Sequence, residues 1–292
     1  PMVPFYTFYS MFGFQRVGDS IWSAADSRAR GFLLGATAGR TTLAGEGLQH
    51  QDGHSLLLAA SVPACQAFDP AFAYELAAIV DDGLQRMYGH DDPHRNEDIF
   101  YYLTIYNEAY EMPPRPDHVD DTDIVRGLYQ WADSPDRPVR ATLVFSGPAQ
   151  VAAREAADEL AERWGVGVDL WSATSYKRLR EEALAVERRN RLHPDRTAEV
   201  PLVTRLLADG EGPVVAVTDF MKLIPGQVAR WVPRPYHTLG TDGFGRSDTR
   251  EDLRRFFEVD TGHLVVAVLH ALAQEGSIDP SVVTQAIALH EL

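Results

Sequence analysis

The sequence predicts an α/β fold in which parallel sheets are flanked by helices and divided between two domains. The chain has 292 residues, which is longer than a single hydrophobic core serves comfortably. Short apolar runs alternate with segments long enough to form helices, and this alternation is typical of βαβ units with parallel strands. Some runs, such as residues 31–37, are apolar throughout, as expected for strands covered on both faces.

The first part of the chain contains the elements of one such sheet. The aromatic and β-branched segment 4–10 predicts a strand, and residues 19–30 predict a helix with Ile21, Trp22, Ala25 and Ala29 on one face. Asp69-Pro70 should open a helix that reaches residue 87. Residues 38–56 show no sustained period and predict a long loop, a kind of segment that is usually functional in a compact domain. The remaining strands are expected at residues 31–37, 64–68 and 99–106.

A domain boundary is predicted near the middle of the chain. Several prolines and a cluster of aspartates occupy residues 113–123, a composition that is typical of a linker. We therefore expect a first domain over residues 1–115, a linker over 116–137 and a second domain over 138–292.

The second half alternates more regularly than the first. We expect strands at residues 141–146, 168–171 and 214–218. We expect helices at residues 149–164, 179–190, 203–207, 221–228, 265–274 and 280–289.

Composition excludes several classes of protein. A formal net charge of -15 argues against a general nucleic-acid binder, whose surface would be basic. Cys65 is the single cysteine, so neither a disulfide framework nor a cysteine-based zinc site can form, and a reducing cytoplasm is expected. No apolar run approaches the roughly 18 to 20 residues that a membrane span needs, so no membrane partner is expected.

The first candidate site is the aromatic segment at residues 5–16. Most aromatic clusters are core packing, and packing is the competing interpretation here. Tyr9 and Phe12 are the exceptions, because they lie at the carboxyl end of the predicted strand, where open α/β sheets bind ligands. A flat heteroaromatic ring could stack on them.

The second candidate site is the loop at residues 39–55, where Glu46 lies between two glycines and His50 and His54 flank Asp52. On a helix this histidine spacing would suggest a metal, but Asp52-Gly53 indicates a turn, and HQDGH differs from HExxH. No metal site is therefore predicted. Imidazoles beside carboxylates suit proton transfer and binding of an anionic substrate. The alternative, that both histidines only hold the loop together, stays open.

The glycine-rich segment 239–250 is a weaker candidate. It contains GxG but not GxGxxG, so a dinucleotide site is not indicated, and a structural loop between the domains is at least as good an interpretation. Ser247 or Asp248 could cap the helix that follows. Asn107 and Glu108 end a predicted strand and could face a ligand-binding cleft. His193, His237 and His263 are interpreted as ordinary loop or surface residues.

Several blocks together resemble the homodimeric pyruvate dehydrogenase component of bacterial complexes, a thiamine-diphosphate-dependent, transketolase-like family. They occur in order over essentially the whole chain, and the long GRTTL-GEGLQH-DGHS string is the most specific of them. The blocks are PFYTFYSMFGFQRVGD, ARGFLLGATAGRTTLAGEGLQHQDGHS, FDPAFAYE, TDFMKL and LGTDGFGRSDTRE.

The resemblance implies a partial pyrimidine-binding domain followed by a transketolase C-terminal-like domain. Thiamine diphosphate would lie across a dimer interface, with Phe12 stacked on its aminopyrimidine and Tyr9 near the bound intermediate. Glu46 and His50 would lie in the active-site loop, where donors are needed for the carboxylate and alkoxide of the adduct. The implied reaction decarboxylates pyruvate and passes the acetyl unit to a lipoyl-bearing acyltransferase or carrier.

The chain departs from the family pattern in one large respect. The family's diphosphate and Mg²⁺ motif, GDG with a downstream asparagine, does not occur in it, and the glutamate that activates the aminopyrimidine would lie before Pro1. The chain alone is therefore expected to be inactive and to need an N-terminal half or a partner subunit. Two other hypotheses remain: a subunit of a split enzyme that transfers a different two-carbon or acyl unit, and a non-catalytic interaction domain.

Overall fold

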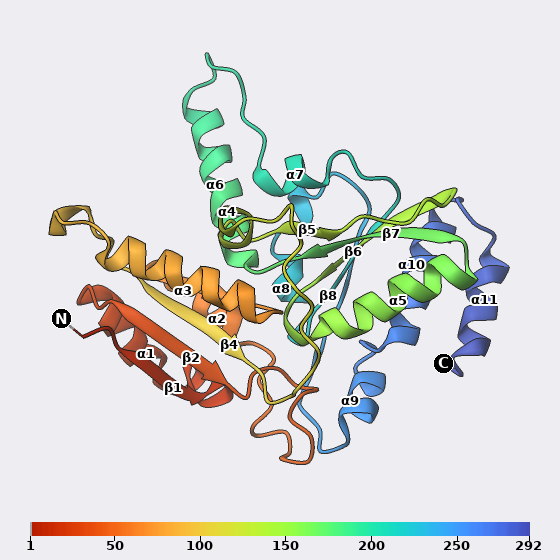
Figure 1. Cartoon of the computed structure of the whole chain (residues 1–292), viewed down its shortest axis with the longest axis horizontal. Coiled ribbons are helices and arrows are strands. Elements are labelled where there is room, and N and C mark those ends of the chain that lie inside the picture. Colours follow the sequence, from red (N-terminus) through yellow and green to blue (C-terminus); the bar gives the residue numbers. More distant parts are fainter. Residues whose placement is uncertain (1) are drawn as a thin grey trace.

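The computed structural model describes residues 2–292 and contains two mainly parallel sheets (Figure 1). In the first sheet the strand order is β1-β2-β4-β3, and every neighbouring pair is parallel. The strands coincide closely with the four predicted in this half. They are β1 (Phe5–Tyr9), β2 (Gly31–Ala36), β3 (Cys65–Phe68) and β4 (Phe100–Ile105).

Three α-helices accompany the first sheet. A 3-10 turn over Ser10–Phe12 joins β1 directly to α1 (Phe14–Asp26), so the aromatic segment turns from strand to helix within a few residues. The long loop predicted at 38–56 is confirmed up to its last turn, where α2 (Ser55–Ala60) begins. The third helix, α3 (Ala73–Tyr88), is followed by a 3-10 turn at Pro93–Arg95.

The second sheet has the order β5-β7-β6-β8-β9. It is parallel except for its edge strand β5, which runs antiparallel to β7. The α/β class with parallel sheets and flanking helices is therefore confirmed. The strands are β5 (Tyr129–Ala132), β6 (Val139–Phe145), β7 (Val166–Ser172), β8 (Val214–Val217) and β9 (Tyr236–Leu239).

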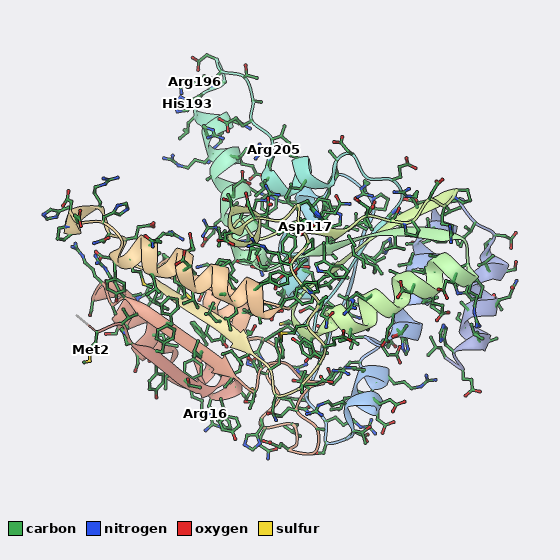
Figure 2. The ribbon with its side chains drawn as sticks, viewed as in Figure 1. Met2, Arg16, Asp117, His193, Arg196 and Arg205 are labelled. Atoms are coloured by element: carbon green, nitrogen blue, oxygen red, sulfur yellow. The ribbon has the colours of Figure 1, made fainter. Side chains whose placement is uncertain are left out.

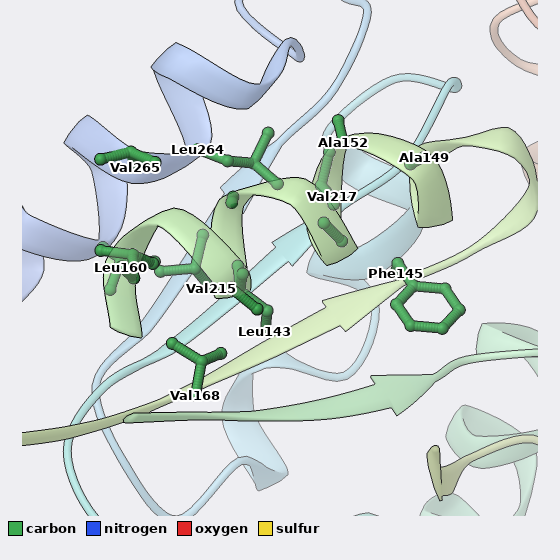
Figure 3. Packing of buried hydrophobic residues seen from close by; sticks show 14 of the residues in the cluster. Leu143, Phe145, Ala149, Ala152, Leu160, Val168, Val215, Val217, Leu264 and Val265 are labelled. Atoms are coloured by element: carbon green, nitrogen blue, oxygen red, sulfur yellow. The ribbon is translucent and has the colours of Figure 1, made fainter. Parts of the chain in front are cut away.

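Helices cover both faces of this sheet. On one face α5 (Gln150–Arg163) and α10 (Thr261–Gln274) pack small and aliphatic side chains onto β6 and β8, as Figure 3 shows for Ala152, Leu264 and Val217. α11 (Pro280–Leu289) packs against α10. The opposite face carries α6 (Tyr176–Leu192), α7 (Leu202–Leu207) and α8 (Leu223–Gly226). The remaining helices are α4 (Asp121–Val125), α9 (Arg250–Phe256) and 3-10 turns at Gly147–Ala149 and Ala229–Trp231.

The two halves share a buried hydrophobic cluster. Leu56 and Ala59 of α2 belong to the same buried cluster as Tyr176 and Leu179 of α6. Polar contacts reinforce the seam: the buried Lys177 ammonium donates to the carbonyl oxygen of Val62 at 2.8 Å. The halves are therefore joined by packing and by buried hydrogen bonds.

Two predicted helices of the first half begin at the wrong residue. α1 begins at Phe14 rather than at residue 19, because Phe14 and Ile21 are buried on one face and anchor its first turns. Trp22, assigned to the inward face, is 53% exposed. α3 begins four residues after Asp69, because Asp69 is held in the seam between the halves and cannot cap a helix there.

The second half also differs from the prediction in places. Strand β5 and helix α4 lie inside the range expected to be linker, and strand β9 and helix α9 were not predicted. α8 covers only part of the predicted 221–228 helix. The cap of α9 is Thr249, which accepts from the Asp252 backbone N–H, rather than Ser247 or Asp248. Short elements such as these carry too few periodic residues to be recognised.

The segment Arg250–Gln274 is long and apolar enough to cross a membrane by length and composition, which corrects our expectation that no run approaches that length. It contains α9 and α10, and half of its most apolar window is buried inside the protein. Leu264, Val265, Val268 and Leu269 of α10 are fully buried in the core of the second half. Core packing thus accounts for the apolar composition of this helix.

A glycine in the turn after β6 should be intolerant of a side chain. Gly147 has a left-handed φ of +51°, and an added Cβ would lie 2.5 Å from the Tyr106 hydroxyl oxygen. Gly165 has a similar φ of +66° but open space around it. Gly165→Ala should therefore cost about 1–2 kcal/mol of backbone strain. Gly147→Ala should cost a further ~1–3 kcal/mol from crowding, measured by urea unfolding. Equal losses would contradict this account.

Candidate active site

An aromatic surface forms where β1 turns into α1. Tyr9 ends the strand and is 45% exposed, and Phe12 follows in the 3-10 turn with its ring centroid 5.9 Å from that of Tyr9. The turn is tight because Gly13 approaches the Phe8 ring so closely that any Cβ would collide with it at 1.9 Å. The local sequence thus exposes two aromatic rings at the carboxyl end of an edge strand.

The long loop after β2 brings His50 to this surface. The imidazole centroid lies 5.5 Å from the Tyr9 ring and 5.4 Å from the Phe12 ring, which it meets edge-on at 72°. The Arg16 guanidinium lies 4.8 Å from the centroid of Phe12 (Figure 2 labels Arg16 at the edge of the first half). We call Tyr9, Phe12 and His50 the aromatic cluster.

Glu46 completes the predicted set of residues. Its Oε2 lies 3.6 Å from Nδ1 of His50, and its backbone oxygen lies 3.3 Å from the same nitrogen. When Nδ1 carries the proton it donates to the Glu46 backbone oxygen, which leaves Nε2 of His50 to exchange a proton or contact a ligand. The four residues predicted to act together therefore lie together, although their roles stay predictions.

Asp52 holds the loop against the end of β1. Its buried carboxylate accepts the Ser10 hydroxyl and the backbone N–H groups of His54 and Ser55, at 3.0 and 2.9 Å. The sequence identified Asp52 as part of a turn and as a carboxylate beside His50 and His54. The D-G turn signal identified the turn but could not show that the side chain points inward to Ser10.

His54 lies away from the aromatic cluster. Its Nε2 is 2.7 Å from Oε1 of Gln15, and its Nδ1 is 4.0 Å from Asp52. This arrangement favours the interpretation that His54 holds the loop in place. Among residues 2–292, no group of three or more histidine, cysteine or acidic side chains could hold a metal ion.

Asp219, just after β8, fixes the beginning of the same loop. Its carboxylate accepts the backbone N–H groups of Arg40 and Thr41 at 3.0 and 3.1 Å. Gly39 has φ +77°, and an added Cβ would lie 2.1 Å from Asp219. Burial raises the pKa of Asp219 to about 7, although the hydrogen bonds to Thr41 partly offset this rise. The surrounding TDFMKL block carries part of the family resemblance, but its local sequence does not indicate a role for Asp219.

The glycine-rich segment 239–250 lies alongside the loop as structural support. Gln51 donates to the carbonyl oxygens of Leu43 and Arg246 at 3.0 and 2.8 Å and accepts the Arg246 backbone N–H at 2.6 Å. These contacts match the interpretation of segment 239–250 as a structural loop between the two halves. They give the active-site loop one wall that comes from the second half of the chain.

Asn107 and Glu108 contact α9 rather than the aromatic cluster. Glu108 forms an ion pair with Arg254, and the Asn107 carbonyl oxygen accepts from Arg250 at 2.7 Å. The structure therefore places Asn107 and Glu108 in a contact between the two halves, and not at the aromatic cluster.

Comparison with known families matches both halves. Residues 1–113 match the pyruvate dehydrogenase E1 component middle domain, and residues 127–260 match the transketolase-like C-terminal domain. The chain belongs to the pyruvate dehydrogenase E1 component family. The resemblance deduced from the motif blocks is thereby confirmed.

Individual relatives give the same result. The pyruvate dehydrogenase E1 component of Mycolicibacterium smegmatis is 55% identical over 98% of this chain, which spans 30% of the length of that relative. Transketolase from Campylobacter jejuni has a similar fold, with a TM-score of 0.68, 18% identity and coverage of 92% of this chain and 36% of its own. A split-gene transketolase, described as an inactive β4 tetramer, matches with a TM-score of 0.65 at 19% identity, over 93% of this chain and 77% of its own.

The aromatic cluster fits one end of the cofactor that this family implies. Thiamine diphosphate has a flat aminopyrimidine ring, and Phe12 presents a partly exposed ring at the carboxyl end of β1. The observed fit concerns the ring of the cofactor.

Asp219 should make the stability of the chain depend on pH. Because its pKa rises from 3.8 to about 7 on folding, the folded state retains a proton that the unfolded state releases. The resulting stabilisation is complete below about pH 4 and is lost as the pH rises through about 7. Urea unfolding from pH 4 to 8 should show that the free energy of unfolding falls more steeply for wild type than for Asp219→Asn. Parallel curves would show that Asp219 has an ordinary pKa.

Proposed function

We propose that the chain forms the substrate-facing side of a thiamine-diphosphate site in a pyruvate dehydrogenase that passes the acetyl unit to a lipoyl carrier. The observation that carries this proposal is the convergence of Tyr9, Phe12, Glu46 and His50, from two segments of the chain, into one exposed cluster. Similarity to relatives such as the pyruvate dehydrogenase E1 component of M. smegmatis supports the reaction.

Each residue of the cluster has a role that suits this chemistry. Phe12 stacks on the aminopyrimidine, and Tyr9 presents a hydroxyl to the bound substrate. His50, oriented by Glu46 through Nδ1, offers Nε2 to the substrate carboxylate or to a proton in transit. When bound, the cofactor supplies the nucleophilic carbon and the electron sink that decarboxylation requires.

Other parts of the assembly complete the site. We infer that an N-terminal half or a partner subunit holds the diphosphate and Mg²⁺, and that the working unit is a homodimer-type assembly serving a lipoyl-bearing acyltransferase in the cytoplasm. The relatives' greater length supports this, since the chain spans 30% of the M. smegmatis protein. Co-expression of the chain with the N-terminal part of such a relative, followed by an assay of pyruvate-dependent carbon dioxide release, tests the proposal directly. A folded complex that binds the cofactor but releases no carbon dioxide would overturn it.

His50 should be needed for turnover. In the reconstituted enzyme His50→Ala should lower kcat about a hundred-fold, the usual contribution of a positioned acid or base, with little change in cofactor affinity. His54→Ala is the matched control, because the two imidazoles lie in one loop and are similarly exposed, at 28% for His54 and 29% for His50. If both variants lost activity equally, His50 would have only a loop-holding role.

Phe12 should act mainly on cofactor affinity. Phe12→Ala should raise the cofactor concentration for half-maximal rate, since a stacked ring contributes roughly 1–3 kcal/mol by analogy with base stacking. Activity at saturating cofactor should largely recover. Tyr6→Ala is the control, because Tyr6 is a 63% exposed aromatic residue of β1 that lies outside the cluster. Phe14 is unsuitable, because it is buried edge-on against Tyr102 at 4.8 Å and its loss would affect folding. Equal shifts for both variants would contradict a stacking role for Phe12.

A further inference from the structure

A cavity of about 490 Å³ lies outside the aromatic cluster, at the carboxyl edge of the second sheet. Pro148 and Ala149, which follow β6, line one part of it, and Thr218 and Asp219, which follow β8, line another. The chain leaves β6 toward β7 on one side and later returns to β8 on the other, so β6 and β8 flank the point where the strand order reverses. In open α/β sheets, ligands bind in the crevice at this point.

Three arginines of α9 form the cationic wall of this cavity: Arg250, Arg254 and Arg255. Arg254 donates through one Nη to Glu108, and Arg250 donates through Nε and one Nη to loop carbonyl oxygens. Within residues 2–292, neither Nε nor the other Nη of Arg254 has a protein acceptor. A guanidinium with spare donors is suited to a planar or tetrahedral oxyanion.

Acidic side chains also line the cavity, but three of the four are engaged by neighbours. Asp219 accepts two backbone N–H groups, and Asp260 accepts the His263 backbone N–H as the cap of α10. Glu155 accepts the Thr261 hydroxyl at 2.6 Å, and Glu251 is exposed in the first turn of α9. Arg250 and Arg255 are also engaged, by backbone carbonyl oxygens, so the spare cationic donors of the cavity belong to Arg254.

Another part of the cavity lining is apolar and made of small side chains. Ala149, Val151, Ala152 and Val259 line it, and Figure 3 shows Ala149 and Ala152 at the beginning of α5. The cavity volume falls within the ~300–1,000 Å³ of small-molecule sites. A ligand that fills it would need an anionic end for α9 and an apolar body for α5.

We propose that this cavity is a second ligand site, which binds a small amphipathic anion bearing a phosphate or a carboxylate group. It shares Thr41 and Asp219 with the base of the active-site loop, and Arg250 donates to the carbonyl oxygen of Thr42 at 2.7 Å. An anion that binds Arg250 and Arg254 therefore affects the contact between Arg250 and the loop that carries His50. The ligand would act as an effector of that loop. The binding itself does not depend on the proposed dehydrogenase activity.

Binding can be tested on the chain itself by calorimetric titration. The probes are phenyl phosphate, benzoate and uncharged phenol, which share one apolar body and differ in their charged group. Saturable binding of phenyl phosphate or benzoate, with phenol at least about tenfold weaker, supports the site, and the tighter of the two anions identifies its preferred group. Equal binding of phenol, or no saturable binding of either anion, overturns the proposal.

Variants locate the binding. Arg254→Gln should weaken the preferred anion about tenfold or more, and Ala152→Leu, which fills the apolar wall, should weaken it similarly. Arg188→Gln is the charge-matched control, because Arg188 is exposed on α6 away from the cavity, and it should bind as wild type does. Thermal unfolding of each variant checks that it is folded.

Glu108→Gln tests whether anion binding depends on the guanidinium of Arg254 itself or on its ion pair with Glu108. This variant breaks the Glu108–Arg254 pair but keeps the guanidinium, so anion affinity should be retained or improved. Weakening equal to that of Arg254→Gln would show that the ion pair only maintains the local structure, and would overturn the proposal. Wild-type affinity in both Arg254→Gln and Ala152→Leu would also overturn it.

Discussion

The buried carboxylate of Asp219 connects the second sheet to the loop that carries the candidate catalytic residues. It stands immediately after β8 and accepts backbone N–H groups from Arg40 and Thr41, where the loop leaves β2. An unpaired buried carboxylate would be costly, and these hydrogen bonds offset part of its desolvation. Because these hydrogen bonds hold the backbone of Arg40 and Thr41 in place, they help to set where the loop begins its path toward the aromatic cluster.

Two further buried carboxylates join the halves in the same manner. Asp69 accepts hydroxyl groups of Thr104 and Ser146, and Glu75 accepts those of Tyr129 and Ser172, each at 2.6 Å. Burial raises the pKa of both carboxyl groups. In each set one hydroxyl or more comes from the second half of the chain, so separating the halves would remove part of the hydrogen bonding of both carboxylates. Together with the shared hydrophobic core, this arrangement favours one fixed geometry around the loop over two domains that move freely.

The candidate site is divided between residues that follow directly from a strand and residues carried by a long loop. Tyr9 and Phe12 follow directly from a strand, and their position depends on the close contact of Gly13 with Phe8. Glu46 and His50 lie farther along the loop and are partly exposed. Asp219 holds the beginning of this segment, and Asp52 holds its end. The loop therefore has anchored ends and an exposed middle, which suits residues that must meet a substrate and release a product.

The sequence alone determined the α/β class and the four strands of the first sheet, and it predicted that Tyr9, Phe12, Glu46 and His50 act together. Strands and motif blocks are local patterns, and buried parallel strands leave a clear apolar signature. The tertiary structure decided what depends on contacts between distant residues. Strand β5 exists because β7 pairs with it, α3 begins late because Asp69 is held by Ser146, and Asp219 reaches Thr41 across 178 residues of chain. The cavity lined by α9 belongs to this second group, because its walls come from segments that only the folded sheet brings together.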